Sequence, residues 1–143
     1  MNNNNQEKIG SATEKFIAKA FKNKGYWAYI IPRKTNGQPC DIFAAKGINN
    51  KVIVYLVDAK HVRDYEVSFP FSRIEPNQYA SMNYALNFAK LSNLGFVIFF
   101  EKDKTLYYLP YQDVLKYTAM GMKSVNMSKL AKFEEILNDE DNF

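Results

Sequence analysis

The segment VIVYLVDAKHV, residues 52–62, constrains the fold of this chain more than any other. Its run of β-branched and aromatic residues is typical of a buried β-strand, yet it ends in Asp58 and Lys60 rather than in a turn. Side chains two residues apart on a strand share one face, so this carboxylate and this amine point the same way. A solvated surface pair of this kind contributes less than about 1 kcal/mol, so its meaning depends on which other residues join it.

The pattern around this strand predicts an α/β fold with a mixed central β-sheet flanked by helices. Apolar residues recur at helical spacing before Gly25 and after Pro76, and the apolar runs between and beyond them are typical of strands. The polar stretch KGINN joins two strands as a hairpin. We expect a helix over residues 8–24, strands over 26–32, 40–45 and 51–60, a helix over 75–90, strands over 95–101 and 105–110, and short helices over 112–118 and 127–137.

Length and composition indicate a single domain over residues 1–143 with one hydrophobic core. We expect residues 1–7 to be a flexible lead-in and residues 111–143 to be a C-terminal helical extension. No apolar run approaches the length of a membrane span and no signal-peptide pattern opens the chain, so we expect a cytoplasmic protein without membrane contact. One cysteine and one histidine exclude an internal disulfide and a zinc site rich in these residues.

The formal net charge of +4 indicates a moderately basic surface, and the acidic residues 133–143 leave the rest of the chain more basic still. Such a surface suits a polyanion such as DNA. Four cations in the expected loops are candidate phosphate contacts, although each is equally well explained as a solubilising charge: Arg33, Lys34, Arg63 and Arg73.

Two further acids are candidates to join the Asp58–Lys60 pair. A hairpin folded about residues 48–50 sets Asp41 opposite a residue between Leu56 and Asp58. A partner at either end of that range places Asp41 on the face of Asp58, which we expect, whereas a slip of one residue places it on the other face. Glu14 borders the apolar stripe of the first helix, so its carboxylate is expected to reach the edge of the sheet.

Clustered carboxylates repel one another unless a cation neutralises them, and Mg²⁺ does so with oxygen ligands. Such an ion makes a bound water more acidic, and a neighbouring ammonium group stabilises developing negative charge. Two or three acids and a lysine therefore suit metal-assisted attack on a phosphodiester.

The motifs that carry these residues resemble those of the PD-(D/E)xK nuclease superfamily. The triplet PCD, residues 39–41, is similar to its first half-motif, and DAK, residues 58–60, to its second. GSATEKF, with Glu14, is similar to a helix of Holliday-junction resolvases, and FPFSRIEPNQYASM, with Gln78, to a segment of RecU-type resolvases. The resemblance covers residues 10–110 and implies a restriction-endonuclease-like αβββαβ core.

The resemblance also implies the role of each residue. Asp41, Asp58 and the backbone carbonyl of Ala59 would bind Mg²⁺, with Mn²⁺ as a substitute, and Glu14 would assist through water. Lys60 would position or activate the attacking water, and Gln78 would support the site or contact the cleaved strand. The implied protein is a homodimer that nicks four-way DNA junctions in recombination and repair, in the cytoplasm of a bacterial or phage-infected cell.

Two departures from the RecU-type pattern keep other functions open. Asp58 stands where that branch usually has glutamate, and the turn PRKTNGQP, residues 32–39, is short where RecU-type proteins carry a long protrusion. One alternative is a restriction- or repair-type nuclease acting on duplex or flap DNA. Another is a module that binds nucleic acid without cutting it.

The remaining candidates favour structural roles. His61 alternates to the face opposite Lys60, and Cys40 is expected to be a small buried residue because no base lies near it in sequence. Tyr107, Tyr108 and Tyr111 could stack on bases, but their place in and after a strand favours the core or a dimer interface.

Overall fold

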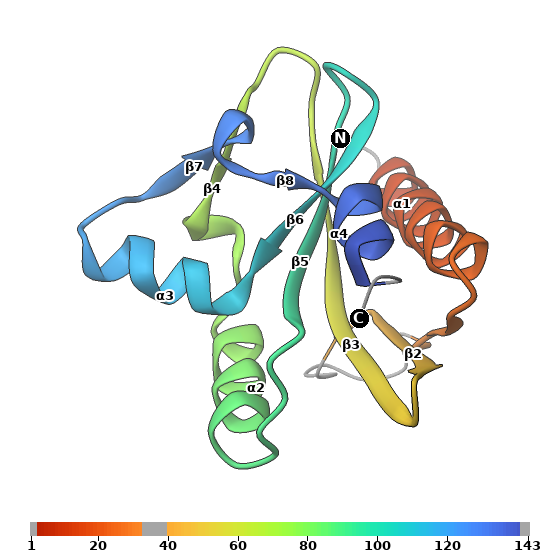
Figure 1. The fold of residues 1–143 in the computed structure, drawn as a ribbon. Coiled ribbons are helices and arrows are strands. Elements are labelled where there is room, and N and C mark those ends of the chain that lie inside the picture. The colour runs from red at the N-terminus through yellow and green to blue at the C-terminus, as the bar shows by residue number, and fades with distance from the viewer. Residues whose placement is uncertain (1–2, 33–39, 141–143) are drawn as a thin grey trace.

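The computed structural model describes residues 3–32 and 40–140, which form a mixed α/β fold (Figure 1). The helices are α1 (Asn3–Asn23), α2 (Pro76–Asn87), α3 (Tyr111–Ala119) and α4 (Phe133–Glu140), with the short 3-10 turns η1 (Phe71–Arg73) and η2 (Met127–Lys129). The strands are β1 (Trp27–Ile30), β2 (Ile42–Ile48), β3 (Lys51–Val62), β4 (Ser68–Pro70), β5 (Leu94–Phe100), β6 (Thr105–Pro110), β7 (Ser124–Asn126) and β8 (Ala131–Lys132). No described helix is long and apolar enough to cross a bilayer.

The central sheet has six strands in the order β1-β2-β3-β5-β6-β8. Only β3 and β5 run parallel, because the chain between them crosses over through α2, and the other neighbours pair antiparallel. Strands β4 and β7 form a separate antiparallel pair. The predicted mixed sheet flanked by helices is confirmed.

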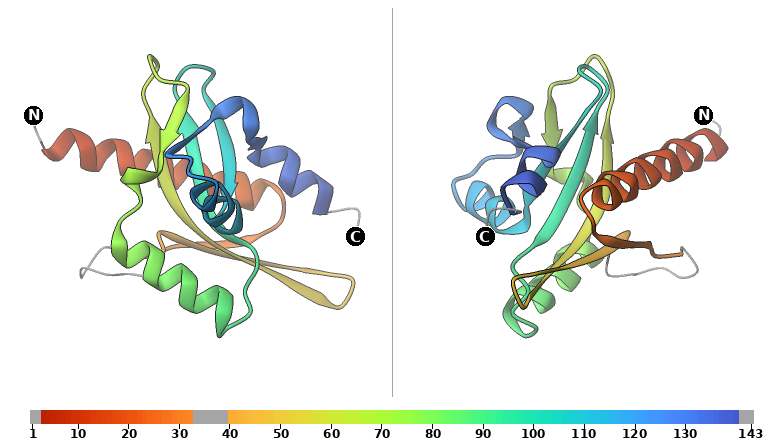
Figure 2. Two further views of the ribbon diagram at one scale, coloured as in Figure 1. Left: turned by 90° about the vertical axis from the view of Figure 1, so that its left-hand side faces the viewer. Right: turned by 45° about the vertical axis from the view of Figure 1, so that its right-hand side comes forward.

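Helices cover both faces of this sheet (Figure 2). Ile17 of α1 and Leu137 of α4 pack in one core with Val57 of β3. Met82 of α2 and Val114 of α3 belong to the core on the opposite face. Alternate side chains of β3 enter opposite cores. The position of a residue along β3 therefore decides which face of the sheet its side chain occupies.

A tight turn sets the register of the β2–β3 hairpin. Asn49 and Asn50 have φ values of 52° and 67°, the left-handed conformation that a two-residue type I′ turn requires at both positions. Asparagine tolerates this conformation better than most residues, so the Asn49–Asn50 pair itself favours the turn. Ile48 consequently pairs with Lys51, and the pairing continues to Ile42 opposite Val57.

The structure differs from the sequence prediction mainly at the ends of the chain. Helix α1 includes residues 3–7, assigned above to a flexible lead-in, because no proline or glycine there stops a helix that is already nucleated. The helix expected over residues 127–137 is instead η2, the short strand β8 and α4, so the region after residue 111 is not wholly helical. Tyr107, Tyr108 and Tyr111 are buried in the core, as one of the two predictions for them stated.

Candidate active site

Asp41, the residue just before β2, lies beside Asp58 of β3. The hairpin ladder ends with Ile42 opposite Val57, and the backbone N–H of Asp41 donates to the Val57 carbonyl at 3.1 Å. The Asp41 carboxylate accepts a hydrogen bond from the backbone N–H of Ala59 at 2.9 Å. Both acids are buried, with 8% and 2% of their surfaces exposed. The register therefore puts Asp41 on the face of Asp58.

This pair is electrostatically strained without a cation. The pKa of Asp58 is raised to about 8, first by burial and then by the negative charge of Asp41, while the nearby Lys60 opposes the shift. The Oδ2 atom of Asp58 is buried and has no hydrogen-bond partner among the described residues. A buried carboxylate oxygen without a donor is costly, and a hard divalent cation would satisfy it. The donor set therefore fits Mg²⁺ or Mn²⁺.

Lys60 shares the face of the two acids and is held in place by two acceptors. Its Nζ donates to the Gln78 side-chain oxygen at 3.2 Å and to the Arg73 carbonyl at 3.1 Å. Burial lowers the pKa of Lys60, the negative charge of Asp58 opposes this, and the Arg73 charge adds to it. An ammonium group with a lowered pKa loses its proton more readily than a surface lysine does.

Gln78 connects this lysine to the start of α2. Glu75 caps the helix, and Gln78 is the third residue inside it, so the two form a reciprocal capping box. The Gln78 side-chain oxygen accepts from the backbone N–H of Glu75 at 3.0 Å and from Lys60 at 3.2 Å. Helix capping and lysine positioning thus use the same atom.

Glu14, the third acid expected at the site, is buried on α1 with 7% of its surface exposed. Gly10 and Thr13 of the same helix line a groove of about 560 Å³ together with Ala59 and Lys60. The described His, Cys, Asp and Glu side chains form no group of three or more that could hold a metal ion. Asp41 and Asp58 are the two carboxylates that the hairpin register brings together, and Glu14 is a third buried acid on α1, which packs against β3.

The buried Cys40 thiol is not a nucleophile in this environment. Its Sγ lies 3.5 Å from the Ile42 carbonyl oxygen, to which it donates. Burial raises the pKa of this thiol to about 12, and the charges of Asp58 and Asp41 act in the same direction. The predicted structural role of Cys40 agrees with this environment.

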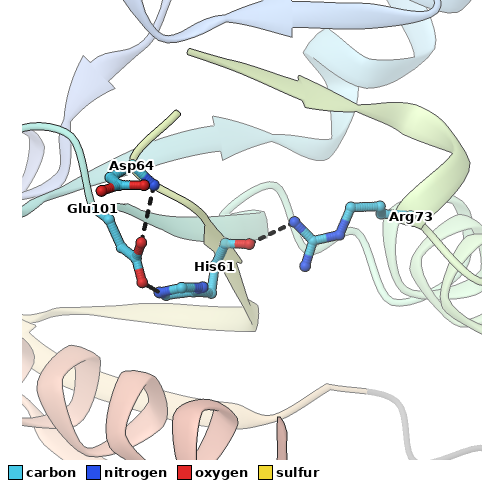
Figure 3. Close-up of polar contacts among 4 residues, drawn as sticks. All are labelled: His61, Asp64, Arg73 and Glu101. Atoms are coloured by element: carbon cyan, nitrogen blue, oxygen red, sulfur yellow. Dashed lines mark hydrogen bonds and ion pairs between the residues drawn. The ribbon is translucent and has the colours of Figure 1, made fainter. Parts of the chain in front are cut away.

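His61 and Arg73 both form polar contacts with other residues of the protein (Figure 3). The His61 Nε2 atom lies 2.9 Å from Oε1 of Glu101, whose other oxygen accepts from the Asp64 backbone N–H at 2.9 Å. The Arg73 guanidinium donates to the His61 carbonyl and lies over the Phe69 ring, 5.6 Å from its centroid. Arg73 therefore fastens η1 to the end of β3, a role that its position in a polar loop did not suggest.

Of the other three candidate phosphate contacts, the structure describes Arg63 alone. Arg63 is exposed on the loop after β3 and lines the 560 Å³ groove with Arg73. Arg33 and Lys34 lie outside the described residues.

A buried acid pair with a lysine on the second and third strands of an αβββαβ core defines the PD-(D/E)xK nuclease superfamily. Within that class, the family model of Recombination protein U, RecU, matches residues 45–142, more than half of the chain. The chain therefore belongs to the RecU family, the Holliday-junction resolvases that bind DNA in recombination and repair. A comparison with proteins of curated function finds no match.

The matched range includes Asp58, Lys60 and Gln78 but begins after Glu14 and Asp41. The place of Asp41 in the site therefore rests on the β2–β3 register and on its hydrogen bond with Ala59.

Proposed function

We propose that this protein is a divalent-metal-dependent endonuclease that cuts DNA strands at four-way junctions. The observation that carries the proposal is the buried Asp41–Asp58 pair, in which Asp58 Oδ2 has no hydrogen-bond partner among the described residues, next to the Lys60 ammonium group. Family membership supports the junction as substrate, and the donor set supports the metal.

Each residue of the site has its own role in this proposal. Asp41 and Asp58, with the Ala59 carbonyl, would hold the ion, and a bound ion would supply Lewis-acid stabilisation of charge on the cleaved phosphate. Lys60 orients the attacking water and, in its neutral amine form, takes up the proton of that water; burial favours this form by lowering the pKa of Lys60. Gln78 keeps the lysine aimed through its 3.2 Å hydrogen bond, and Glu14 assists through water from α1.

We further propose that the protein acts as a homodimer. Resolving a four-way junction requires two cuts in strands related by symmetry, and the described part of each chain contains one buried pair of aspartates, Asp41 and Asp58. A two-fold dimer supplies two such sites in the orientation that paired cuts need.

The direct test incubates the protein and the Asp58→Asn variant with labelled four-way junctions, with and without Mg²⁺. We expect paired cuts by the unmodified protein only when Mg²⁺ is present, and a loss of at least a hundredfold in the variant. Equal cutting by both proteins, or none by either, would reject the proposed site.

A second candidate, a nuclease for duplex or flap DNA, is favoured by the short segment between β1 and β2, which spans only residues 31–41. Competition between a junction and a linear duplex or flap of the same sequence separates the two. Preferential cutting of the junction supports the proposed function, and preferential cutting of the duplex or flap supports the second candidate.

A further inference from the structure

Strand β1 carries an exposed pair of stacked aromatic rings. Trp27 and Tyr29 expose 62% and 49% of their surfaces, and their ring planes are 4° apart with centroids at 6.1 Å. Phe43 of the neighbouring strand meets Trp27 edge-on at 5.8 Å. We name these three residues the aromatic platform.

The aromatic platform lies on the same face of the sheet as the acid pair. The alternate residues of β1, Ala28 and Ile30, pack in the core beneath α1, so Trp27 and Tyr29 point away from that helix. On β2, Ile42 belongs to the same core, so Phe43 and Asp41 both face away from α1. The platform and the two buried acids therefore share one face of the sheet.

The platform is also close to the acids along this face. Phe43 pairs with Tyr29 and stands two residues from Asp41, which on a strand is about 6.6–6.8 Å. One further two-residue step along β1 reaches Trp27. The platform therefore begins one two-residue step from the level of Asp41 and ends two such steps away, at Trp27.

We propose that the aromatic platform stacks on unpaired DNA bases next to the phosphate that is cut. This inference rests on the proposed function, because it takes the face around Asp41 and Asp58 as the one that receives the DNA. Large aromatic faces bind bases of any identity by stacking, which suits a sequence-tolerant contact. Bases inside a duplex have no free face, whereas bases at a branch point can offer one. The platform therefore favours branched or single-stranded DNA over duplex.

The chain offers a direct spectroscopic readout, because Trp27 is its single tryptophan. The experiment uses the Asp58→Asn variant of the whole chain, which we expect to bind without cutting, and titrates it with oligothymidylate, a four-way junction and a linear duplex. Total binding is followed separately by the anisotropy of dye-labelled DNA. We expect tryptophan emission to be quenched by oligothymidylate and by the junction, and to change little with the duplex.

Substitutions in the same background measure the contribution of stacking. We expect Trp27→Ala to weaken junction binding by about tenfold to a hundredfold, Trp27→Phe to restore most of it, and duplex binding to stay within about twofold. The matched control is Tyr84→Ala with Phe88→Ala, which removes another exposed aromatic pair, with centroids 4.9 Å apart, from α2. This control is expected to bind both DNAs normally.

Three outcomes would overturn the inference. The first is DNA binding by anisotropy without any change in tryptophan emission. The second is equal quenching by duplex and junction. The third is a change in emission with protein concentration in the absence of DNA, which would assign this face to a second copy of the chain. None of these outcomes depends on cleavage. If the protein bound DNA but did not cut it, the proposed function would be rejected, and the titration would still show whether the platform stacks on bases.

Discussion

The side-chain oxygen of Gln78 lies 3.2 Å from the Nζ atom of Lys60, which donates a hydrogen bond to it. The same oxygen accepts from the Glu75 backbone N–H at 3.0 Å and so completes the capping box of α2. The first turn of this helix is therefore fixed to β3 through the lysine of the active site. A change in the start of α2 is expected to move the amine relative to the acids.

The first prediction separates helix capping from lysine positioning. Gln78→Ala removes an acceptor from Lys60 and half of the capping box, so we expect unfolding to become easier by about 1 kcal/mol and cleavage to slow by about tenfold or more. Glu75→Ala removes the other half of the box but leaves the Gln78–Lys60 hydrogen bond. It is expected to lower stability by a similar amount with a much smaller loss of activity. Chemical denaturation and junction cleavage measure the two effects, and equal activity losses in both variants would show that Gln78 acts only as a cap.

The second prediction concerns the pH dependence of stability in the metal-free protein. Burial and the charge of Asp41 together raise the pKa of Asp58 from 3.8 to about 8, so between these values the folded state holds a proton that the unfolded state has released. The free energy of unfolding should therefore fall as pH rises through this window, by about 1–3 kcal/mol from this group. Added Mg²⁺ should restore stability at pH 8, because it binds the folded state in place of the proton.

Thermal unfolding of the protein from pH 5 to pH 8, in chelator and in Mg²⁺, tests this pH dependence. Asp58→Asn should flatten it, whereas Asp139→Asn, which changes an exposed acid of α4, should leave it unchanged. A metal-free protein that becomes more stable from pH 5 to pH 8 in step with Asp58 would contradict the prediction.

The third prediction separates metal binding from proton transfer. Lys60→Gln removes the amine but leaves both carboxylates, so we expect Mn²⁺ binding to persist and cleavage to fall by at least about a hundredfold. Asp58→Asn should lose both properties. Isothermal titration with Mn²⁺ and single-turnover cleavage of a junction measure them. If the Lys60 variant loses Mn²⁺ binding as completely as the Asp58 variant, the separate roles assigned to these residues are wrong.

The arrangement of Asp58 and Lys60 follows from sequence because strand alternation is a local rule. The position of Asp41 did not follow, because it depends on a hairpin register that a one-residue slip reverses. The structure decides it through the turn at Asn49 and Asn50, whose positive φ values centre the hairpin between them. The sequence contained this signal in its NN pair, but the polar stretch KGINN allowed more than one centre.

Other features could not be predicted because they join distant segments through few residues. Strand β8 has two residues and pairs with Tyr107 and Tyr108, too short a run to show a period. Arg73 contacts the carbonyl of His61 across a loop, and no spacing in the sequence indicates that bond. Glu75 and Gln78 have the spacing of a capping box, with Glu in place of the usual Ser, Thr, Asp or Asn, and this spacing says nothing of Lys60.

The fourth prediction concerns Gly95, where β5 passes close to the end of β6. A Cβ atom at this position would lie 2.3 Å from the Leu109 carbonyl oxygen and 2.9 Å from the Pro110 Cα, and both are backbone atoms that cannot rotate away. Gly95→Ala should therefore force β5 and β6 apart and lower the free energy of unfolding by about 1–3 kcal/mol. Since β5 is the parallel neighbour of Asp58 and Lys60, cleavage should fall as well.

Gly47→Ala is the matched control, because it makes the same change in another strand, β2, without a clash. Its added Cβ would meet nothing closer than the Lys51 carbonyl oxygen at 3.8 Å. It should leave stability unchanged or raise it slightly, because alanine restricts the unfolded chain more than glycine does. Urea unfolding of both variants makes the comparison. Equal stability of the two would mean that β5 and β6 separate at little cost, and that the close approach at Gly95 does not support the acid pair.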